Sequence, residues 1–430
     1  MSRKVAFKTL GCRLNQFETD SIVTDFHKAG YEIVPFESQA DVYVINTCTV
    51  TNQSDQKSRN TINQAVKYAG NKGITIVTGC MVSSRKDFLE SRNDITYVVD
   101  NKNKSSVFPL VESHFNGEVV LPSDFNQDLF GFTVVEKGFH TRSMVKIQDG
   151  CNNFCSYCIV PKVRGREISR PAGDVLENIR QVVGLGFKEV VLTGVNIGRY
   201  YHSGLIFEDL VEKVLQLPGD FRVRISSIEP EGFTDKFIEL FENPKLCQHL
   251  HLCLQSGSDE ILKLMRRFYT VDQFTRFTEK FKKRYPLFNF TTDVIVGFPG
   301  ETDGHFQQSA DVARNIGFSH IHTFKYSMRK GTLAEKLPNH IPEKIKAGRS
   351  ETIRAIAEEN KAAYRRMFIG KEQTVLIERP NDKPGAKGYG EHYIPIAIKD
   401  CNAEQNTFRK VVIADIANDA DKTAIGHLKA

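Results

Sequence analysis

The chain has 430 residues, a net charge of +6, and 40% hydrophobic residues. A chain of this length is too long to fold around one ordinary hydrophobic core, so we expect two or three domains. No apolar stretch is long enough to span a bilayer, and the first twelve residues lack the apolar core and cleavage site of a signal peptide. Nine cysteines, an odd number, suit metal ligation in a reducing compartment better than disulfides. We therefore expect a cytoplasmic protein without a membrane partner.

Residues 1–115 are predicted to form a parallel α/β domain. Three short runs rich in β-branched or aromatic residues read as buried strands, and they end at Cys12, Cys48 and Cys80. The segments 15–29 and 54–69 between them are compatible with helices. This order favours a parallel sheet with right-handed crossovers, which places the three cysteines together at its carboxyl edge.

The alternative for these three cysteines is that each is a separate buried thiol, since free cysteine packs as a small hydrophobic residue. Three thiols at equivalent strand ends favour a shared site instead. Cys247, Cys253 and Cys401 follow no such pattern and are interpreted as structural thiols.

Residues 116–142 lack strong periodicity and are predicted to be a linker, and residues 143–370 alternate between strands and helices. Six strands are predicted, at residues 143–148, 188–194, 221–228, 249–255, 288–298 and 319–327. Helices are predicted among them, at residues 174–185, 207–217 and 270–285. Six such units favour an open, partial barrel, whose active site would lie at the carboxyl ends of its strands.

The chain is predicted to end in a helix and a small β-barrel. Residues 342–370 have the pattern of a long, charged amphipathic helix, and residues 371–430 alternate between short strands and turns. The whole charge excess lies in residues 151–370, which hold 32 basic against 26 acidic residues. Such an excess can steer a polyanion, although each basic run alone is as compatible with a solvated helix face.

A second set of cysteines, Cys151, Cys155 and Cys158, has the spacing C-x3-C-x2-C directly after the first strand of the predicted barrel. Three thiolates at this spacing can hold three irons of a cubane cluster and leave the fourth iron open to a small molecule. The alternatives are a structural zinc site and three buried thiols. The zinc site is disfavoured because zinc favours C-x2-C pairs with a fourth Cys or His in a second pair, and no such second pair is present.

These features resemble the radical S-adenosylmethionine (SAM) methylthiotransferase family over nearly the whole chain. The resemblance implies an N-terminal domain with one [4Fe-4S] cluster on Cys12, Cys48 and Cys80. It also implies a partial (β/α)6 radical SAM barrel with a second [4Fe-4S] cluster on Cys151, Cys155 and Cys158, and a C-terminal TRAM β-barrel. The segments TLGCRLNQFETD, NTCTVTNQSDQKSR and RISSIEP resemble the threonylcarbamoyladenosine branch, often called MtaB.

The resemblance implies an enzyme that methylthiolates C2 of N6-threonylcarbamoyladenosine beside the anticodon of tRNA. Its cofactors would be SAM and two clusters, one generating a radical from SAM and one delivering sulfur. It would need an external flavodoxin-like or ferredoxin-like electron donor and a sulfur source. Alternative substrates within the family are isopentenyladenosine in tRNA and an aspartate of a ribosomal protein. A further alternative is a non-enzymatic iron–sulfur protein that binds RNA or carries electrons.

Motifs at strand ends resemble the SAM-binding segments of the family, and ordinary packing at the barrel rim is the alternative for each of them. The expected SAM contacts are Tyr157, Gly194, Asn196, Ser226, Glu229, Gln255, Gly297 and Pro299. His249 and His251 alternate in one strand and are interpreted as hydrogen-bonded wall residues rather than ligands.

The expected C-terminal barrel suggests RNA contact, because barrels of this kind bind nucleic acid through surface strands and loops. Cations and aromatic rings around one hairpin offer phosphate contacts and stacking surfaces. The expected RNA contacts are Lys383, Lys387, Tyr389, His392 and Tyr393.

Overall fold

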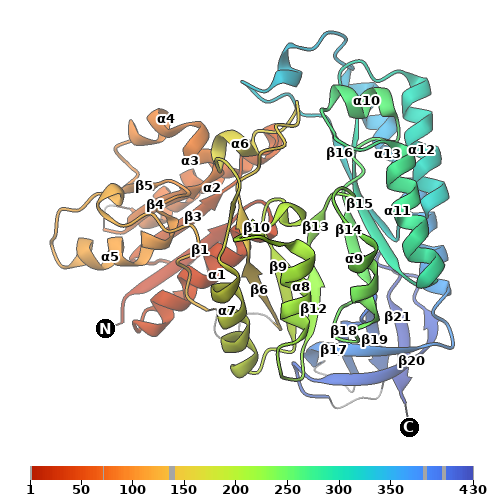
Figure 1. The fold of residues 1–430 in the computed structure, drawn as a ribbon. Coiled ribbons are helices and arrows are strands. Elements are labelled where there is room, and N and C mark those ends of the chain that lie inside the picture. Colours follow the sequence, from red (N-terminus) through yellow and green to blue (C-terminus); the bar gives the residue numbers. More distant parts are fainter. Residues whose placement is uncertain (1, 71, 135–140, 381–384, 400–402, 430) are drawn as a thin grey trace. The chain divides into compact units, whose positions relative to one another are not determined.

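The computed structural model describes all residues except 1, 71, 135–140, 381–384, 400–402 and 430 (Figure 1). The chain packs into two compact units. Unit 1 consists of Met1–Glu136, Lys146–Arg170 and Ser327–Glu335, and unit 2 consists of Lys137–Val145, Pro171–Tyr326 and Lys336–Ala430. Among the described residues, no helix combines the length and apolar character needed to cross a membrane.

Unit 1 is built on a parallel five-stranded sheet with the order β2-β1-β3-β4-β5. Its strands are β1 (Lys4–Thr9), β2 (Glu32–Val34), β3 (Val42–Thr47), β4 (Ile74–Gly79) and β5 (Tyr97–Val99). Every residue of β3 and β4 is buried. A central strand covered on both faces needs apolar side chains on both, which is why these strands read as continuous hydrophobic runs.

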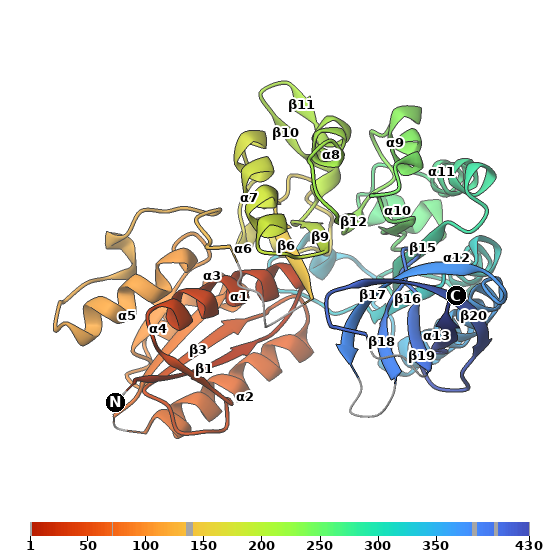
Figure 2. The ribbon, with the colours of Figure 1, turned by 90° about the horizontal axis from the view of Figure 1, so that it is seen from below.

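Helices cover both faces of this sheet (Figure 2). The main ones are α1 (Arg13–Lys28), α2 (Asn52–Ala69), α3 (Cys80–Ser84), α4 (Lys86–Glu90) and α5 (Val107–Phe115). Helices α1 and α5 share one apolar cluster with β1, β3 and β4, and α2, α3 and α4 share the cluster on the other face. The predicted βαβαβ layout is confirmed.

Unit 2 holds the partial barrel, in two parallel sheets with the orders β12-β9-β6 and β13-β14-β15-β16. Its strands are β6 (Arg142–Lys146), β9 (Glu189–Thr193), β12 (Arg222–Ile225), β13 (Ser227–Ile228), β14 (His249–Leu252), β15 (Asn289–Val296) and β16 (His320–Lys325). Segments β12 and β13 are one strand interrupted at Ser226. The first part pairs with β9 and the second with β14, so this strand joins the two sheets.

Helices follow the barrel strands and form its outer layer. They are α7 (Ala172–Gly184), α8 (Phe207–Leu215), α9 (Asp235–Glu239), α10 (Asp259–Leu264), α11 (Val271–Arg284) and α12 (Asp303–Ile316). Capping boxes start α11 at Thr270 and α12 at Thr302, where each side chain accepts a hydrogen bond from the third helical N–H. The predicted strands and helices of the barrel are confirmed.

The long helix α13 (Glu343–Arg366) leads into a closed five-stranded barrel, also within unit 2. The barrel strands are β17 (Glu372–Pro380), β18 (Gly385–Tyr389), β19 (Pro395–Lys399), β20 (Phe408–Ile416) and β21 (Ala424–Leu428). In the described part of this barrel each strand pairs on both sides, so closure leaves no open sheet edge there. The expected fold class is therefore confirmed, while the domain boundaries at residues 115, 142 and 370 stay predictions.

Candidate iron–sulfur and S-adenosylmethionine site

The first cysteine triplet lies at the carboxyl ends of three neighbouring strands in unit 1. Cys12 is the N-cap of α1, Cys48 follows β3 directly, and Cys80 is the first residue of α3 after β4. A β-carbon built on Gly11 would lie 3.0 Å from Sγ of Cys48, so the turn before Cys12 passes close to that thiol. The predicted convergence of the three cysteines is what the parallel sheet produces.

The thiols of this triplet influence one another electrically. Burial raises the pKa of the Cys48 thiol, and negative charge on Cys80 and Cys12 raises it further. Three thiolates are therefore costly at this place unless a cation lies among them. A metal cluster requires deprotonated thiolates and supplies positive charge, so this donor set fits the expected [4Fe-4S] cluster.

Asn15 holds two of the ligand-bearing turns together. Its side-chain amide donates to the carbonyl of Leu10, 2.8 Å away, and to the carbonyl of Thr47, 3.1 Å away. These carbonyls lie just before Cys12 and Cys48 respectively. A buried amide with both donors satisfied fixes the spacing of the two turns.

The second triplet lies in a loop between β7 (Gln148–Asp149) and α6 (Val160–Val163), within unit 1. All three thiols are half-buried. The Cys158 N–H donates to the Cys155 carbonyl at 3.0 Å, and the Asn153 N–H donates to Sγ of Cys151 at 3.4 Å. An N–H aimed at sulfur favours the thiolate form, which is the form that binds metal. This loop also fits a cluster.

Gly150 sets the start of this loop. Its φ is +69°, and a β-carbon there would lie 1.9 Å from the carbonyl oxygen of Arg166. Both the left-handed backbone and the close approach therefore require glycine.

We expect Gly150→Ala to displace the second cysteine loop and to remove about half of the iron bound after anaerobic reconstitution, since the protein would lose one of its two four-iron clusters. Iron analysis of the purified protein measures this. Gly173→Ala is the matched control, because a β-carbon at Gly173 meets nothing within 4 Å. Full iron content in Gly150→Ala would contradict the assignment of the loop.

The two triplets belong to the same compact unit. Helix α3, which begins with Cys80, packs against α6, which follows Cys158. Cys80 forms one buried cluster with Ile159 and Val163. The amide of Asn101 donates to the Val163 carbonyl at 2.8 Å and lies 3.9 Å from Sγ of Cys80. The packing of α3 against α6 therefore places Cys80 of the first triplet beside the segment that directly follows Cys158 of the second triplet.

A buried charge network connects the same two segments. Glu18, on α1, accepts hydrogen bonds from Arg164 at 3.0 and 3.1 Å and forms ion pairs with Lys104 at 2.5 Å and Lys146 at 3.1 Å. Asp149, two residues before Cys151, pairs with Arg164 at 3.0 Å and with Lys146 at 2.6 Å. All five side chains are almost completely buried.

The network holds three cations and two carboxylates, so it has one positive charge in excess. Burial raises the pKa of Glu18, but Arg164, Lys104 and Lys146 outweigh it and hold that pKa well below its usual range. The charge of Cys80 acts on both Arg164 and Lys104. An anionic group at the first triplet would balance the excess charge.

Segment Ser327–Glu335, far along the chain, also packs within unit 1. The guanidinium of Arg329 donates to Thr49, Asp55 and Asn52, each at 2.8 Å. The Ala334 N–H donates to the carbonyl of Ser156 at 2.8 Å. Thr49 follows Cys48 and Ser156 follows Cys155, so this segment braces both ligand loops. Sequence reasoning missed Asn15, Glu18, Arg164 and Arg329, because no periodic or spacing signal distinguishes them.

Most expected SAM contacts lie in unit 2, at or just beyond strand ends. Gly194 and Asn196 follow β9, Ser226 separates β12 from β13, and Gln255 follows β14. Tyr157 is half-buried in unit 1. Glu229 forms an ion pair with Arg267 at 3.1 Å.

Two of these positions have left-handed backbone. Gln255 has φ +64° and exchanges backbone hydrogen bonds with Asp293 and Ile295 of β15. Gly297 has φ +72°, and a β-carbon there would lie 2.3 Å from Cγ of Lys346. Such conformations in residues other than glycine cluster at ligand sites, so Gln255 supports a site at this edge.

The hairpin expected to contact RNA is partly engaged within unit 2. Tyr389 and Tyr393 stack with ring centroids 5.0 Å apart, and the guanidinium of Arg142 lies 4.5 Å from the Tyr389 ring. His392 is buried, with its ring nitrogens 3.1 Å from Gln373 and 3.2 Å from Gln248. Lys387 is exposed, and Lys383 lies outside the described residues. Of the expected RNA contacts that the structure describes, Lys387 is exposed, and Tyr389 and Tyr393 are half-buried.

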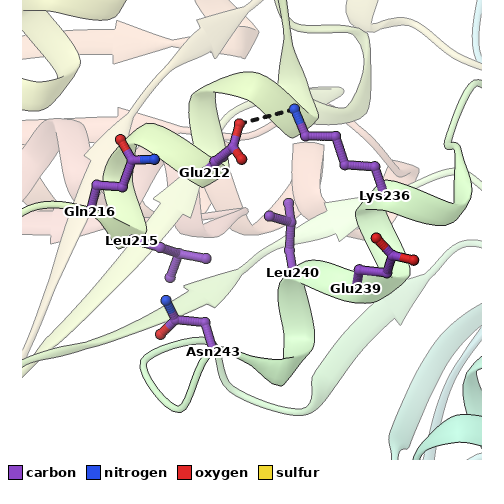
Figure 3. A pocket seen from close by; sticks show the side chains of 7 residues that line it. All are labelled: Glu212, Leu215, Gln216, Lys236, Glu239, Leu240 and Asn243. Atoms are coloured by element: carbon purple, nitrogen blue, oxygen red, sulfur yellow. Dashed lines mark ion pairs between the residues drawn. The ribbon is translucent and has the colours of Figure 1, made fainter.

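A separate cavity of ≈ 320 Å³ opens between α8, α9 and the 3-10 turn at Leu240–Glu242 (Figure 3). Lys236 crosses it to pair with Glu212 at 3.0 Å. It is lined by helix residues of the outer layer and contains none of the expected site residues. It carries no part of the site.

Family comparisons match both halves of this arrangement. The model of the Radical SAM superfamily matches residues 145–313. The model described as "Uncharacterized protein family UPF0004" matches residues 4–100, the part that bears the first triplet. The fold and the C-x3-C-x2-C loop thus define a radical SAM protein with an added three-cysteine α/β domain.

Relatives span nearly the whole chain. A protein of Thermotoga maritima named threonylcarbamoyladenosine tRNA methylthiotransferase MtaB is 35% identical, over 91% of this chain and 90% of its own length. A protein of the same name from Chlamydia pneumoniae is 37% identical, over 86% of each chain. A tRNA-2-methylthio-N(6)-dimethylallyladenosine synthase of Helicobacter acinonychis is 32% identical, over 89% of this chain and 88% of its own length. The chain belongs to the radical SAM methylthiotransferase family.

Solved structures support the fold. The radical SAM methyltransferase TsrM of Kitasatospora setae, solved with cobalamin and a [4Fe-4S] cluster bound, has a TM-score of 0.56 and 14% identity. It covers 76% of this chain and 75% of its own length. At this identity the likeness concerns the fold alone.

Proposed function

We propose that this chain attaches a methylthio group to C2 of N6-threonylcarbamoyladenosine beside the anticodon of tRNA. The observation that carries the proposal is the presence of two cysteine triplets at strand ends of one compact unit, in a chain similar to threonylcarbamoyladenosine tRNA methylthiotransferases over 86–91% of its length. A single cluster would suffice to generate a radical. A second open cluster suits the delivery of sulfur.

The net reaction replaces the C2 hydrogen of adenine with sulfur and a methyl group. No side-chain base can remove that unactivated hydrogen, which is why a cofactor must carry the chemistry. When bound, one cluster and SAM would supply a carbon radical, the other cluster would supply sulfur, and a second SAM would supply the methyl group. The reaction also requires an external one-electron donor and a sulfur source, whose identities stay open.

The chain's own residues position these groups. Cys151, Cys155 and Cys158 would hold the cluster that binds SAM, and Cys12, Cys48 and Cys80 would hold the other. Asn15, Arg329 and the network around Glu18 fix the ligand loops by hydrogen bonds and ion pairs. The strand ends near Gly194, Ser226, Gln255 and Gly297 would orient SAM. Rigid positioning is the protein's share of such catalysis.

The sister substrate, dimethylallyladenosine in tRNA, is the second candidate. Relatives named for it are also similar, although at 31–34% identity. A ribosomal-protein substrate and a non-enzymatic role stay alternatives, and a competition assay between two tRNAs tests them as well. The cytoplasmic location stays a prediction as well.

A competition assay with two tRNAs, one carrying each hypermodified adenosine, tests the proposal. The reconstituted enzyme should methylthiolate the threonylcarbamoyl tRNA in preference, as read by nucleoside mass spectrometry. Equal or better reaction with the dimethylallyl tRNA would assign the chain to the sister substrate. Reaction with neither, together with SAM cleavage on reduction, would point to the ribosomal protein.

A further inference from the structure

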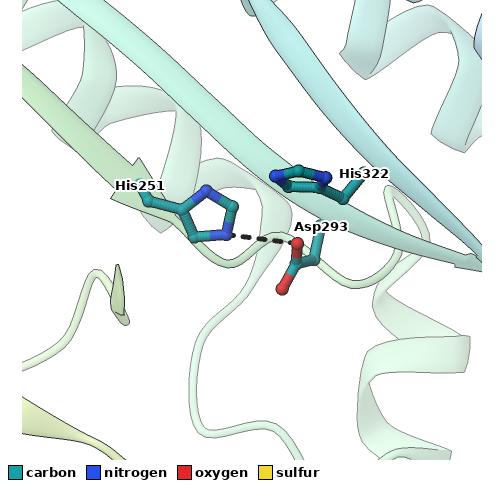
Figure 4. Close-up of side chains that lie close together, drawn as sticks. All are labelled: His251, Asp293 and His322. Carbon is teal, nitrogen blue, oxygen red and sulfur yellow. Dashed lines mark ion pairs between the residues drawn. The ribbon is translucent and has the colours of Figure 1, made fainter. Parts of the chain in front are cut away.

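His251, Asp293 and His322 form a polar cluster on three neighbouring strands of unit 2 (Figure 4). The ring nitrogen Nε2 of His251 lies 3.2 Å from Oδ1 of Asp293. One ligand-type atom from each of the three residues lies within 4.8 Å of those of the other two. Side-chain exposure rises from 11% at His251 to 25% at Asp293, and His322 is exposed. The cluster is thus open to a ligand on one side.

Strand register places this cluster on the inner face of the partial barrel. Asp293 of β15 is the direct partner of His322 of β16, and His251 of β14 is the partner of Thr291. Residues on the opposite face of β15, such as Thr292 and Val294, are fully buried. That face lies against the helical layer, where α13 packs on β15 and β16. The histidines therefore point away from the helices, into the barrel.

Hydrogen bonds orient the cluster before any ligand arrives. The Thr291 hydroxyl lies 3.0 Å from Nδ1 of His251 and 3.1 Å from Nε2 of His249. Nε2 of His320 lies 3.3 Å from Nδ1 of His322. With Nδ1 of His251 engaged by Thr291, Nε2 faces the carboxylate of Asp293. Preorganised polar groups of this kind bind without paying the full cost of ordering.

Asp293 supplies the carboxylate of the cluster, and three histidine rings act on it. Burial raises the pKa of Asp293, but the hydrogen bond from His251 and the charges of His251, His322 and His320 outweigh it and lower that pKa. Burial and the charge of His322 lower the pKa of His320 to about 4. At neutral pH the cluster therefore offers an anionic acceptor beside imidazole N–H donors.

The strand ends expected to hold SAM are close to this cluster along the same strands. Gln255 lies four residues beyond His251, and its N–H donates to the carbonyl of Asp293 at 2.8 Å. Gly297 lies four residues beyond Asp293. A substrate placed in the barrel for reaction would meet these polar groups.

We propose that His251, Asp293 and His322 bind the threonylcarbamoyl group of the substrate and so select it against an apolar side chain. This inference rests on the proposed function. The threonylcarbamoyl group carries a carboxylate, a hydroxyl and carbamoyl N–H groups. The exposed imidazole of His322 suits the carboxylate as a donor, and Asp293 suits the hydroxyl or an N–H as an acceptor.

The dimethylallyl group offers no partner for either residue. Binding it would remove His322 and Asp293 from water and give neither of them a ligand partner in exchange, which is the costly side of hydrogen bonding. Sites built for polar partners reject apolar analogues strongly for this reason. A divalent metal is the other chemistry that two imidazoles and a carboxylate can hold. Nε2 of His251 and Oδ1 of Asp293 already interact with each other, so a metal ion would have to break this contact in order to bind both atoms. This favours the organic ligand.

The test measures kcat/KM for the two tRNAs with the reconstituted enzyme and with His322→Leu. We expect the variant to lose about tenfold to a hundredfold in preference for the threonylcarbamoyl tRNA, the range for one hydrogen bond to a charged group. Thr323→Val, on the same strand but the opposite face, is the matched control and should keep the native preference.

The outcomes separate this inference from the proposed function. A native enzyme that prefers the threonylcarbamoyl tRNA, with an unchanged preference in His322→Leu, would overturn the inference alone. A native preference for the dimethylallyl tRNA would overturn both. One equivalent of non-cluster metal, whose removal by a chelator abolishes the preference while both clusters stay intact, would overturn it in favour of a metal site.

Discussion

Replacement of Glu18 by glutamine should cost about 3–5 kcal/mol of unfolding free energy in unit 1, the usual effect of removing one partner from a buried ion pair. Glu18 is 1% exposed and faces Arg164, Lys104 and Lys146. Without its charge, only Asp149 would remain against three buried cations. Such a loss is large beside a typical total of about 5–15 kcal/mol. Hydrogen exchange of peptides from α1, read by mass spectrometry, measures the loss.

Two further variants show whether charge balance is the cause. Glu90→Gln removes an exposed carboxylate 3.6 Å from Lys86 and should cost about 0.5 kcal/mol or less. Arg164→Met leaves two cations facing two carboxylates and should cost less than Glu18→Gln in the iron-free protein. A larger loss in Arg164→Met would show that the hydrogen bonds of the guanidinium, not the charge balance, stabilise the network.

The same network predicts a pH effect of defined sign. The folded chain holds the pKa of Glu18 below its usual range, so Glu18 contributes stability above the unfolded pKa of about 4.3. That stability is lost as the pH falls below this value. The Glu18→Gln variant should lack this part of the acid sensitivity.

Replacement of Cys151, Cys155 and Cys158 by alanine should abolish SAM cleavage and leave about half of the iron, about four atoms per chain. The reciprocal change of Cys12, Cys48 and Cys80 should also leave about half of the iron. That variant should still cleave SAM on reduction, yet form no methylthio product. Iron analysis, detection of 5′-deoxyadenosine and nucleoside mass spectrometry measure the three quantities, and each variant is the control for the other.

Two results would contradict this division of labour. Full iron in the Cys151/Cys155/Cys158 variant would show that this triplet holds no cluster. Loss of SAM cleavage in the Cys12/Cys48/Cys80 variant, with the second cluster shown intact by electron paramagnetic resonance, would show that the first triplet takes part in radical formation.

Much of the fold followed from local patterns. Strands β3 and β4 are buried on both faces, so their residues form continuous apolar runs that can be recognised without a structure. Cys48 and Cys80 end these runs, and parallel strands bring such ends to one edge. The loop that bears the second triplet was equally visible, because ligand spacing within a short segment is a property of the sequence.

The expected RNA contacts show the limit of this reasoning. Tyr389, His392 and Tyr393 share one hairpin, which made them candidates as a group. In the structure the ring of His392 lies within hydrogen-bond distance of Gln248 and Gln373. This contact forms because the partial barrel and the C-terminal barrel pack against each other within unit 2. The sequence around a residue does not indicate that a segment far away along the chain will bury its side chain.

The sequence by itself determined the strands, the helices, the two cysteine triplets and the family. Only the tertiary structure decided which charged residues are buried and which polar residues meet. Glu18 and Arg164 are 146 positions apart, and on a helix Glu18 alone reads as a solvated charge. His251, Asp293 and His322 meet only because three parallel strands pair in one register. Contacts of this kind depend on strand pairing and packing across the chain, and no spacing rule along the chain encodes them.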